Sequence, residues 1–126
     1  MEKPAKPVRW IASSRRDLQA LPKMARRIVG NALWDVQEGR ISRHAKILHG
    51  FGGASVLEIR ADHEGNAYRA VYTVRFSEFV YVLHVFQKKS RRGSKTPADV
   101  MELIRKRLKD AEEQYEEWKA NQGSRD

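Results

Sequence analysis

Two arginines, Arg60 and Arg69, stand where a β-hairpin would bring them side by side. Both lie in segments rich in Val, Ile, Tyr and Phe, and turn-forming residues at 63–66 separate the two segments. A four-residue turn there would pair Asp62 with Ala67 and Arg60 with Arg69. Like charges directly opposite each other destabilise a sheet, whereas two guanidinium groups can share one phosphate. The pair therefore predicts a phosphate-binding face, with two solvated arginines as the alternative.

A third strand would follow a tight turn at residues 77–78 and extend this face. The predicted partners are Phe76 with Phe79, Thr73 with Val82, Val71 with His84 and Arg69 with Phe86. Because alternate strand residues share a face, the phosphate-binding face would carry Arg60, Arg69, His84, Phe86 and Lys88, with Glu58 near its middle. The opposite face would pack on helices through Leu57, Ile59, Tyr68, Tyr72 and Phe76.

The charge of the chain points to a polyanionic partner. The formal net charge is +9 over 126 residues. Residues 88–95 hold five basic and no acidic residues, whereas residues 110–117 hold five acidic and no basic ones. A local basic excess favours nucleic acid first and an anionic membrane surface second.

Other classes of site are absent from the sequence. No cysteine is present, so disulfides and thiolate metal sites are excluded. His44 and His49 flank a loop with spacing unsuited to a metal, and no glycine-rich nucleotide motif occurs. No apolar run approaches the ~20 residues of a membrane span, and the N-terminus lacks the apolar core of a signal peptide. We expect a cytoplasmic protein with no cofactor, no metal and no membrane contact.

The elements that must position these residues follow from caps and periodicity. Ser14 and Asp17 match a capping box, Pro22 suits the first turn of a second helix, and Thr96 with Pro97 starts a third. The expected elements are a strand at 8–12, a helix starting near Arg15, a helix from Pro22 to Glu38, a loop at 39–55, three strands within 56–89, and a helix from Thr96 to about Lys119. This is an α+β domain: two N-terminal helices on a small, mostly antiparallel sheet, then one long helix. We expect one domain over residues 1–126, with flexible ends at 1–7 and 120–126.

The chain resembles the RelE/HigB superfamily of type II toxins, in particular the phage-related HigB-like branch. The match covers about residues 8–112 and rests on the order of several segments. These are Lys46 before the glycine-rich turn at 50–53, V-L-E-I-R at 56–60, Y-R-A-V-Y at 68–72, Y-V-L-H-V-F-Q-K-K-S at 81–90 and T-P at 96–97. The resemblance implies a compact fold and a ribosome-dependent endoribonuclease that cuts mRNA. It also implies a co-encoded antitoxin, which we expect to be a small helix-turn-helix protein.

The resemblance also implies which residues act. Arg60 and Arg69 match basic active-site positions, and Lys89 stands where the family has a basic residue after its last strand, with Lys88 adjacent. Cleavage by the 2′-OH needs a base, cations at the phosphorane and an acid. Some family members use a C-terminal tyrosine, but no Tyr lies between residues 82 and 114. We take His84 as the first candidate base, Glu58 as the second, and Lys88 or Lys89 as the acid.

Further RNA contacts are expected from Lys46, Phe86, Arg91, Arg92 and Lys95. His63 is expected on the surface, in a turn. Two alternatives stay open. The basic face could bind nucleic acid without cleaving it, or the chain could serve mainly to hold a protein partner.

Overall fold

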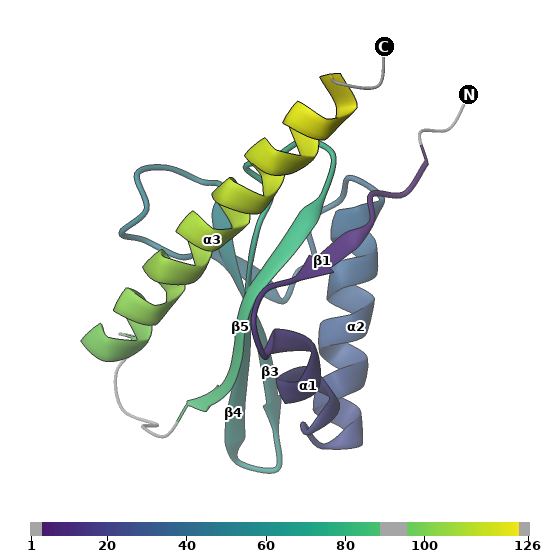
Figure 1. The fold of residues 1–126 in the computed structure, drawn as a ribbon. Helices are drawn as coiled ribbons and strands as arrows, with labels where there is room; N and C mark the ends of the chain where they lie inside the picture. The colour runs from purple at the N-terminus through teal and green to yellow at the C-terminus, as the bar shows by residue number, and fades with distance from the viewer. Residues whose placement is uncertain (1–3, 89–95, 124–126) are drawn as a thin grey trace.

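The computed structural model describes residues 4–88 and 96–123, which fold into two helical layers around one sheet (Figure 1). The elements in chain order are β1 (Val8–Trp10), α1 (Ser14–Gln19), α2 (Lys23–Gln37), β2 (Ala45–Ile47), β3 (Val56–His63), β4 (Asn66–Thr73), β5 (Val80–Lys88) and α3 (Ala98–Gly123). The predicted α+β class, with two N-terminal helices and a long C-terminal one, is confirmed.

The sheet has five strands in the order β1-β5-β4-β3-β2. β1 runs parallel to β5, and the remaining pairs are antiparallel. The strand β2 lies inside the segment 39–55 that was expected to be a loop, so that expectation was wrong there. A three-residue strand is too short to show an alternating pattern, and only its partner β3 defines it.

Each face of the sheet buries its own core. α1 and α2 cover one face, on which α2 contributes Ala25, Val29, Ala32, Leu33 and Val36 and the strands contribute Leu57, Ile59, Tyr68 and Tyr72. α3 covers part of the other face, which we call the α3-side face, and its core contains Val56, Val71, Tyr81, Leu83, Ile104 and Leu108. Phe76 belongs to this second core, so its predicted packing against the N-terminal helices was wrong.

The ends of several elements differ from the expectation. Ser13, not Ser14, occupies the cap position of α1, and its Oγ donates to Asp17 Oδ2 at 2.7 Å. Ser14 is fully buried and donates to the Val82 carbonyl instead. The first strand ends at Trp10 because Ala12 turns the chain with a φ of 51°. α3 continues to Gly123, past the expected end at Lys119.

The predicted register of the first hairpin is confirmed. Arg60 pairs with Arg69, and Glu58 pairs with Val71. In the second hairpin the pairs Val71 with His84 and Arg69 with Phe86 are also confirmed, but Thr73 pairs with Tyr81 rather than Val82. A β-bulge between Val71 and Tyr72 shifts the register by one residue, which sequence alternation does not reveal.

Candidate phosphate-binding site

An anion does lie between the paired arginines, and it is the side chain of Glu58. Glu58 Oε1 is 3.3 Å from Arg60 Nε and 3.6 Å from Arg69 Nε. Only 5% of Glu58 and 7% of Arg69 are exposed. The like-charge pairing of the hairpin is thus offset by an internal carboxylate, so the register alone is no reason to place a bound phosphate between them.

Arg69 is held by further contacts on the same face. Its Nη1 donates to Asp62 Oδ1 at 2.8 Å and to the Tyr68 carbonyl at 2.9 Å. Its Nε has no hydrogen bond of good geometry and faces Glu58 as an ion pair. A guanidinium this buried, with its Nη1 donated to Asp62 and Tyr68, is suited to supporting its neighbours.

Arg60 is the more accessible member of the pair. Its side chain is 34% exposed, and within residues 4–88 and 96–123 its one side-chain hydrogen bond runs from Nε to Glu58. A guanidinium carries donors on its two Nη atoms as well as on Nε. Arg60 is therefore oriented by Glu58 through Nε, while its Nη donors can serve an incoming anion.

A cleft of about 390 Å³ adjoins Arg60 and Glu58. Its walls come from the end of β2 and the loop behind it, from β3, and from the start of α3; the lining residues are Ile47, Leu48, His49, Glu58, Arg60, Thr96 and Met101. Gly50 shapes it, because its φ of 107° is one that other residues rarely adopt and a Cβ there would lie 3.2 Å from Met101 Cε. The volume is in the range of small-ligand sites.

Lys46 and His49 are two further polar side chains at this cleft. Lys46 pairs with Glu58 in the sheet, so it lies on the α3-side face next to the cleft, and its RNA contact stays a prediction. His49 lines the cleft itself. From its spacing to His44, His49 was weighed only as a metal ligand. The signal that could have found it is its position just before the glycine-rich turn that leads into the V-L-E-I-R strand.

The structure separates His84, the first candidate base, from this cleft. The residue between them in the sheet is Val71, which pairs with Glu58 on one side and with His84 on the other. Arg107 of α3 donates from Nη1 to His84 Nδ1 at 3.0 Å, and the imidazole stacks on Phe86 at 4.8 Å. Burial, followed by the charge of Arg107, lowers the pKa of His84 to about 4. With one ring nitrogen occupied and a lowered pKa, His84 is a poor proton acceptor.

Sequence reasoning missed Arg107. It also donates to the Leu83 carbonyl at 3.0 Å, which ties α3 to β5. The signal was present in the stripe of α3: Arg107 stands three residues after Ile104 and four before Ala111, on the apolar side of the helix. A charged residue on that side needs a polar partner on the sheet, and His84 was the polar residue available.

The remaining predicted residues fall into two groups. Phe86 and Lys88 lie on the α3-side face as expected, paired with Arg69 and Ala67. Lys89, Arg91, Arg92 and Lys95 lie outside the described residues. Glu58, the second candidate base, has Oε1 engaged by two arginines, an arrangement that suits a supporting role.

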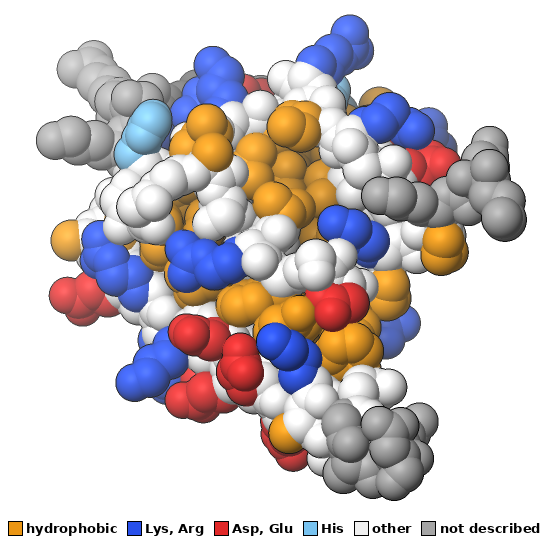
Figure 2. Space-filling view, turned by 90° about the horizontal axis from the view of Figure 1, so that it is seen from above, with side chains coloured by type: hydrophobic (Ala, Val, Ile, Leu, Met, Phe, Trp, Pro, Cys, Tyr) orange, Lys and Arg blue, Asp and Glu red, His pale blue; other side chains and the backbone are white. Residues whose placement is uncertain are grey.

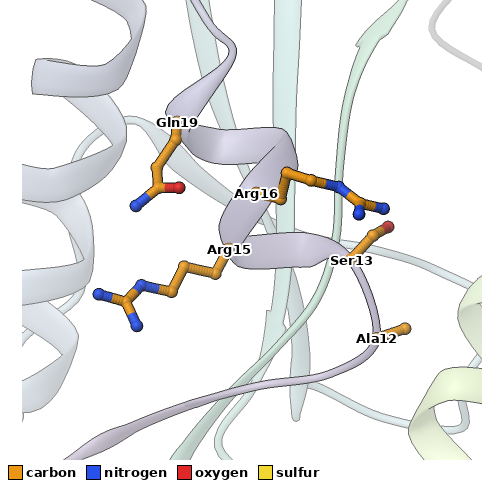
Figure 3. A pocket seen from close by; sticks show the side chains of 5 residues that line it. All are labelled: Ala12, Ser13, Arg15, Arg16 and Gln19. Atoms are coloured by element: carbon orange, nitrogen blue, oxygen red, sulfur yellow. The ribbon is translucent and has the colours of Figure 1, made fainter.

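A second hollow, of about 530 Å³, lies at α1 (Figure 3). It is lined by Ala12, Ser13, Arg15, Arg16 and Gln19. Arg15 and Arg16 extend to different sides of the helix in Figure 3, so they do not converge on one anion.

As far as the structure describes it, the face of the molecule at the C-terminal end of α3 carries no continuous basic patch (Figure 2). Figure 2, seen from above the fold of Figure 1, shows basic side chains spread between acidic and hydrophobic ones. Within the described residues no cluster of three or more His, Cys, Asp or Glu could hold a metal ion. No helix in that part of the chain has the length and apolar content needed to span a membrane.

Comparison with known proteins gives the family. A search of curated proteins finds no match. Among solved structures, the toxin–antitoxin complex RelBE2 from Mycobacterium tuberculosis contains a chain that is 23% identical, with a TM-score of 0.46. That match covers 71% of this chain and 100% of the other. The family model of the phage-derived Gp49-like proteins matches residues 16–109, and the chain therefore belongs to this family.

Proposed function

We propose that this protein is the toxin of a type II toxin–antitoxin system and that it inhibits translation by cleaving mRNA on the ribosome. The observation that carries the proposal is the setting of Arg60. A buried carboxylate orients its guanidinium at the rim of an open cleft, where the Nη donors can reach a phosphate. Membership of the Gp49-like family, together with the resemblance of the sequence to RelE/HigB toxins, supports the same proposal.

The chemistry needs no group beyond side chains and RNA. The 2′-oxygen of a ribose attacks the adjacent phosphorus, and the bond to the 5′-oxygen of the next nucleotide breaks. Negative charge grows on the phosphorane oxygens, and Arg60 would neutralise it through bidentate donation. Lys46 adds positive charge on the same face, next to Glu58 in the sheet.

Glu58 and Arg69 would act through Arg60. A long arginine side chain loses rotamer freedom when it binds an anion, and prior fixation removes part of that cost. Glu58 fixes Nε of Arg60. Arg69 pairs with the same oxygen of Glu58, so the buried carboxylate has a second cationic partner. Both are positioning residues in this mechanism.

Lys88 remains a proposed acid because it lies on the α3-side face, two residues beyond Phe86. Phe86 would offer a ring to a nucleobase, although it already stacks on His84. The roles assigned to Lys89, Arg91, Arg92 and Lys95 rest on the family resemblance and the basic run that holds them.

The partners follow from the proposal. Ribosome and mRNA are the targets, so the protein would act in the cytoplasm. A co-encoded antitoxin, proposed to be a small helix-turn-helix protein, would neutralise it. A helix-turn-helix reading frame beside this gene, together with growth arrest when the toxin is expressed alone, is the genetic test.

The biochemical test compares two substrates. Purified protein is incubated with mRNA on ribosomes and with the same mRNA free in solution, and the products are mapped. Cleavage confined to ribosome-bound mRNA is the expected result. Equal cleavage of free RNA would identify an autonomous nuclease, and salt-sensitive binding without any cleavage would identify a non-catalytic nucleic-acid-binding protein.

A further inference from the structure

We propose that His49 is the proton acceptor for the 2′-hydroxyl in this cleft. The inference rests on the proposed function and supplies the base that function lacks. His84 accepts a hydrogen bond from Arg107 of α3, and Glu58 forms ion pairs with two arginines. The cleft that adjoins Arg60 contains one imidazole, and it belongs to His49.

The backbone on both sides of His49 is fixed. Leu48 N–H donates to the Val56 carbonyl at 2.9 Å, so pairing with β3 continues up to the residue before His49. Gly50 follows with a φ of 107°, and its α-carbon lies close to Met101 of α3. The imidazole therefore starts from a defined position at the wall of the cleft, while His49 itself remains exposed to solvent and substrate.

The other three histidines of the chain lie elsewhere. His44 lines a different hollow, between α2 and residues 40–44. His63 ends β3 and faces Glu64 at 3.6 Å in the hairpin turn. His84 lies beyond Val71 under α3. His44 is thus a matched control: it is close in sequence, partly exposed, and outside the cleft.

The charged groups around His49 come from three elements. β3 contributes Glu58 and Arg60. β2 contributes Lys46, which pairs with Glu58. α3 contributes Arg105, whose guanidinium is 5.7 Å from the ring centre of Phe51 and whose Nη2 would lie 3.6 Å from a Cβ at Gly50. These cations would attract the RNA backbone to the same place as the imidazole.

The proton balance of the step is simple. A ring nitrogen of neutral His49 takes the proton of the 2′-hydroxyl as the 2′-oxygen bonds to phosphorus. The bond from phosphorus to the 5′-oxygen breaks, and that oxygen takes a proton from the acid, the role proposed for Lys88. The products are a 2′,3′-cyclic phosphate and a 5′-hydroxyl, with His49 protonated until solvent restores it.

The test is single-turnover cleavage of ribosome-bound mRNA by the wild type, His49→Gln and His44→Gln, measured between about pH 5 and pH 8. The wild-type rate should rise with pH, because a general base accepts a proton only in its deprotonated form. His49→Gln should lose on the order of 100-fold in rate and lose that rise, as expected for removal of a general base. His44→Gln should behave as the wild type.

Ribosome binding and thermal unfolding of each variant are measured in parallel. Added imidazole should partly restore cleavage by His49→Ala, an effect that a merely structural histidine would not show. If the wild type cleaves mRNA on ribosomes and His49→Gln has the same rate or the same pH profile, this inference is overturned and the proposed function stands. No cleavage by the wild type on ribosomes would overturn the proposed function itself, and this inference with it.

Discussion

Glu58 and Arg69 form a buried ion pair on the α3-side face of the sheet. Their side chains are 7% and 9% exposed, and Glu58 Oε1 lies 3.6 Å from Arg69 Nε. Buried charges are costly unless each has a partner, so the two residues depend on each other. The pair also explains why Arg60 and Arg69 can occupy facing positions: the carboxylate lies against both guanidinium groups.

Arg69→Ala should destabilise the fold. Removal of the guanidinium leaves Glu58 buried beside only one arginine and leaves Asp62 without its 2.8 Å contact. Loss of one partner of a buried ion pair costs about 3 kcal/mol or more. Chemical denaturation measures this, with Arg26→Ala on the exposed side of α2 as the control. A variant as stable as the wild type would show that Arg69 is dispensable to the sheet.

Glu58→Gln should reduce cleavage while ribosome binding is retained. The amide keeps the size of the side chain but removes the charge that holds Arg60 Nε at 3.3 Å. Since Arg60 would keep its own charge, we expect a smaller loss of rate than for Arg60→Ala. Single-turnover rates and ribosome affinity are measured for both variants. A Glu58→Gln rate equal to that of the wild type would remove the positioning role.

His84 should make the fold sensitive to acid. Its pKa is lowered to about 4, first by burial and then by Arg107, so the folded state binds the proton less well than the unfolded chain. The stability this contributes is complete above the unfolded value of ~6.5 and is lost as pH falls toward 4. Melting temperatures at several pH values should fall more steeply for the wild type than for His84→Gln. Parallel curves for the two proteins would contradict the assignment. The cleavage rate of His84→Gln at neutral pH should stay near that of the wild type.

Tyr115→Phe should loosen the attachment of α3 to the β4–β5 turn. The tyrosine hydroxyl donates to Glu78 Oε1 at 2.6 Å, and its ring lies 4.9 Å from that of Phe76. Only the hydrogen bond is lost in the variant, so the free energy of unfolding should fall slightly. Urea denaturation measures this decrease. An unchanged urea midpoint of unfolding would indicate that the hydrogen bond to Glu78 adds nothing to stability beyond what water supplies to the hydroxyl.

The first hairpin was predictable because its turn is explicit in the sequence. Turn formers at 63–66 set the register, and that register placed Arg60 opposite Arg69. Sequence alternation also placed Phe86 and Lys88 on the same face. The whole of this face was expected to be open to solvent. In the structure, Val56, Val71 and Tyr81 make part of it apolar, and α3 covers that part.

The features that were not predictable depend on contacts distant in sequence. The bulge in the β4–β5 pair has no residue signature, and β2 exists only through its pairing with β3. The cleft is formed when the start of α3 meets the loop after β2, so the position of His49 beside Arg60 appears only in three dimensions. The bridging role of Glu58 depends in the same way on two adjacent strands.

The central claim is that Arg60 binds the reacting phosphate, and one measurement tests it directly. Single-turnover cleavage of ribosome-bound mRNA is compared among the wild type, Arg60→Ala and Arg26→Ala, after unfolding curves confirm that all three are folded. Loss of one transition-state donor costs on the order of 100-fold or more in rate. The account predicts this loss for Arg60→Ala, with Arg26→Ala cleaving as the wild type does. Wild-type cleavage by folded Arg60→Ala would contradict the account.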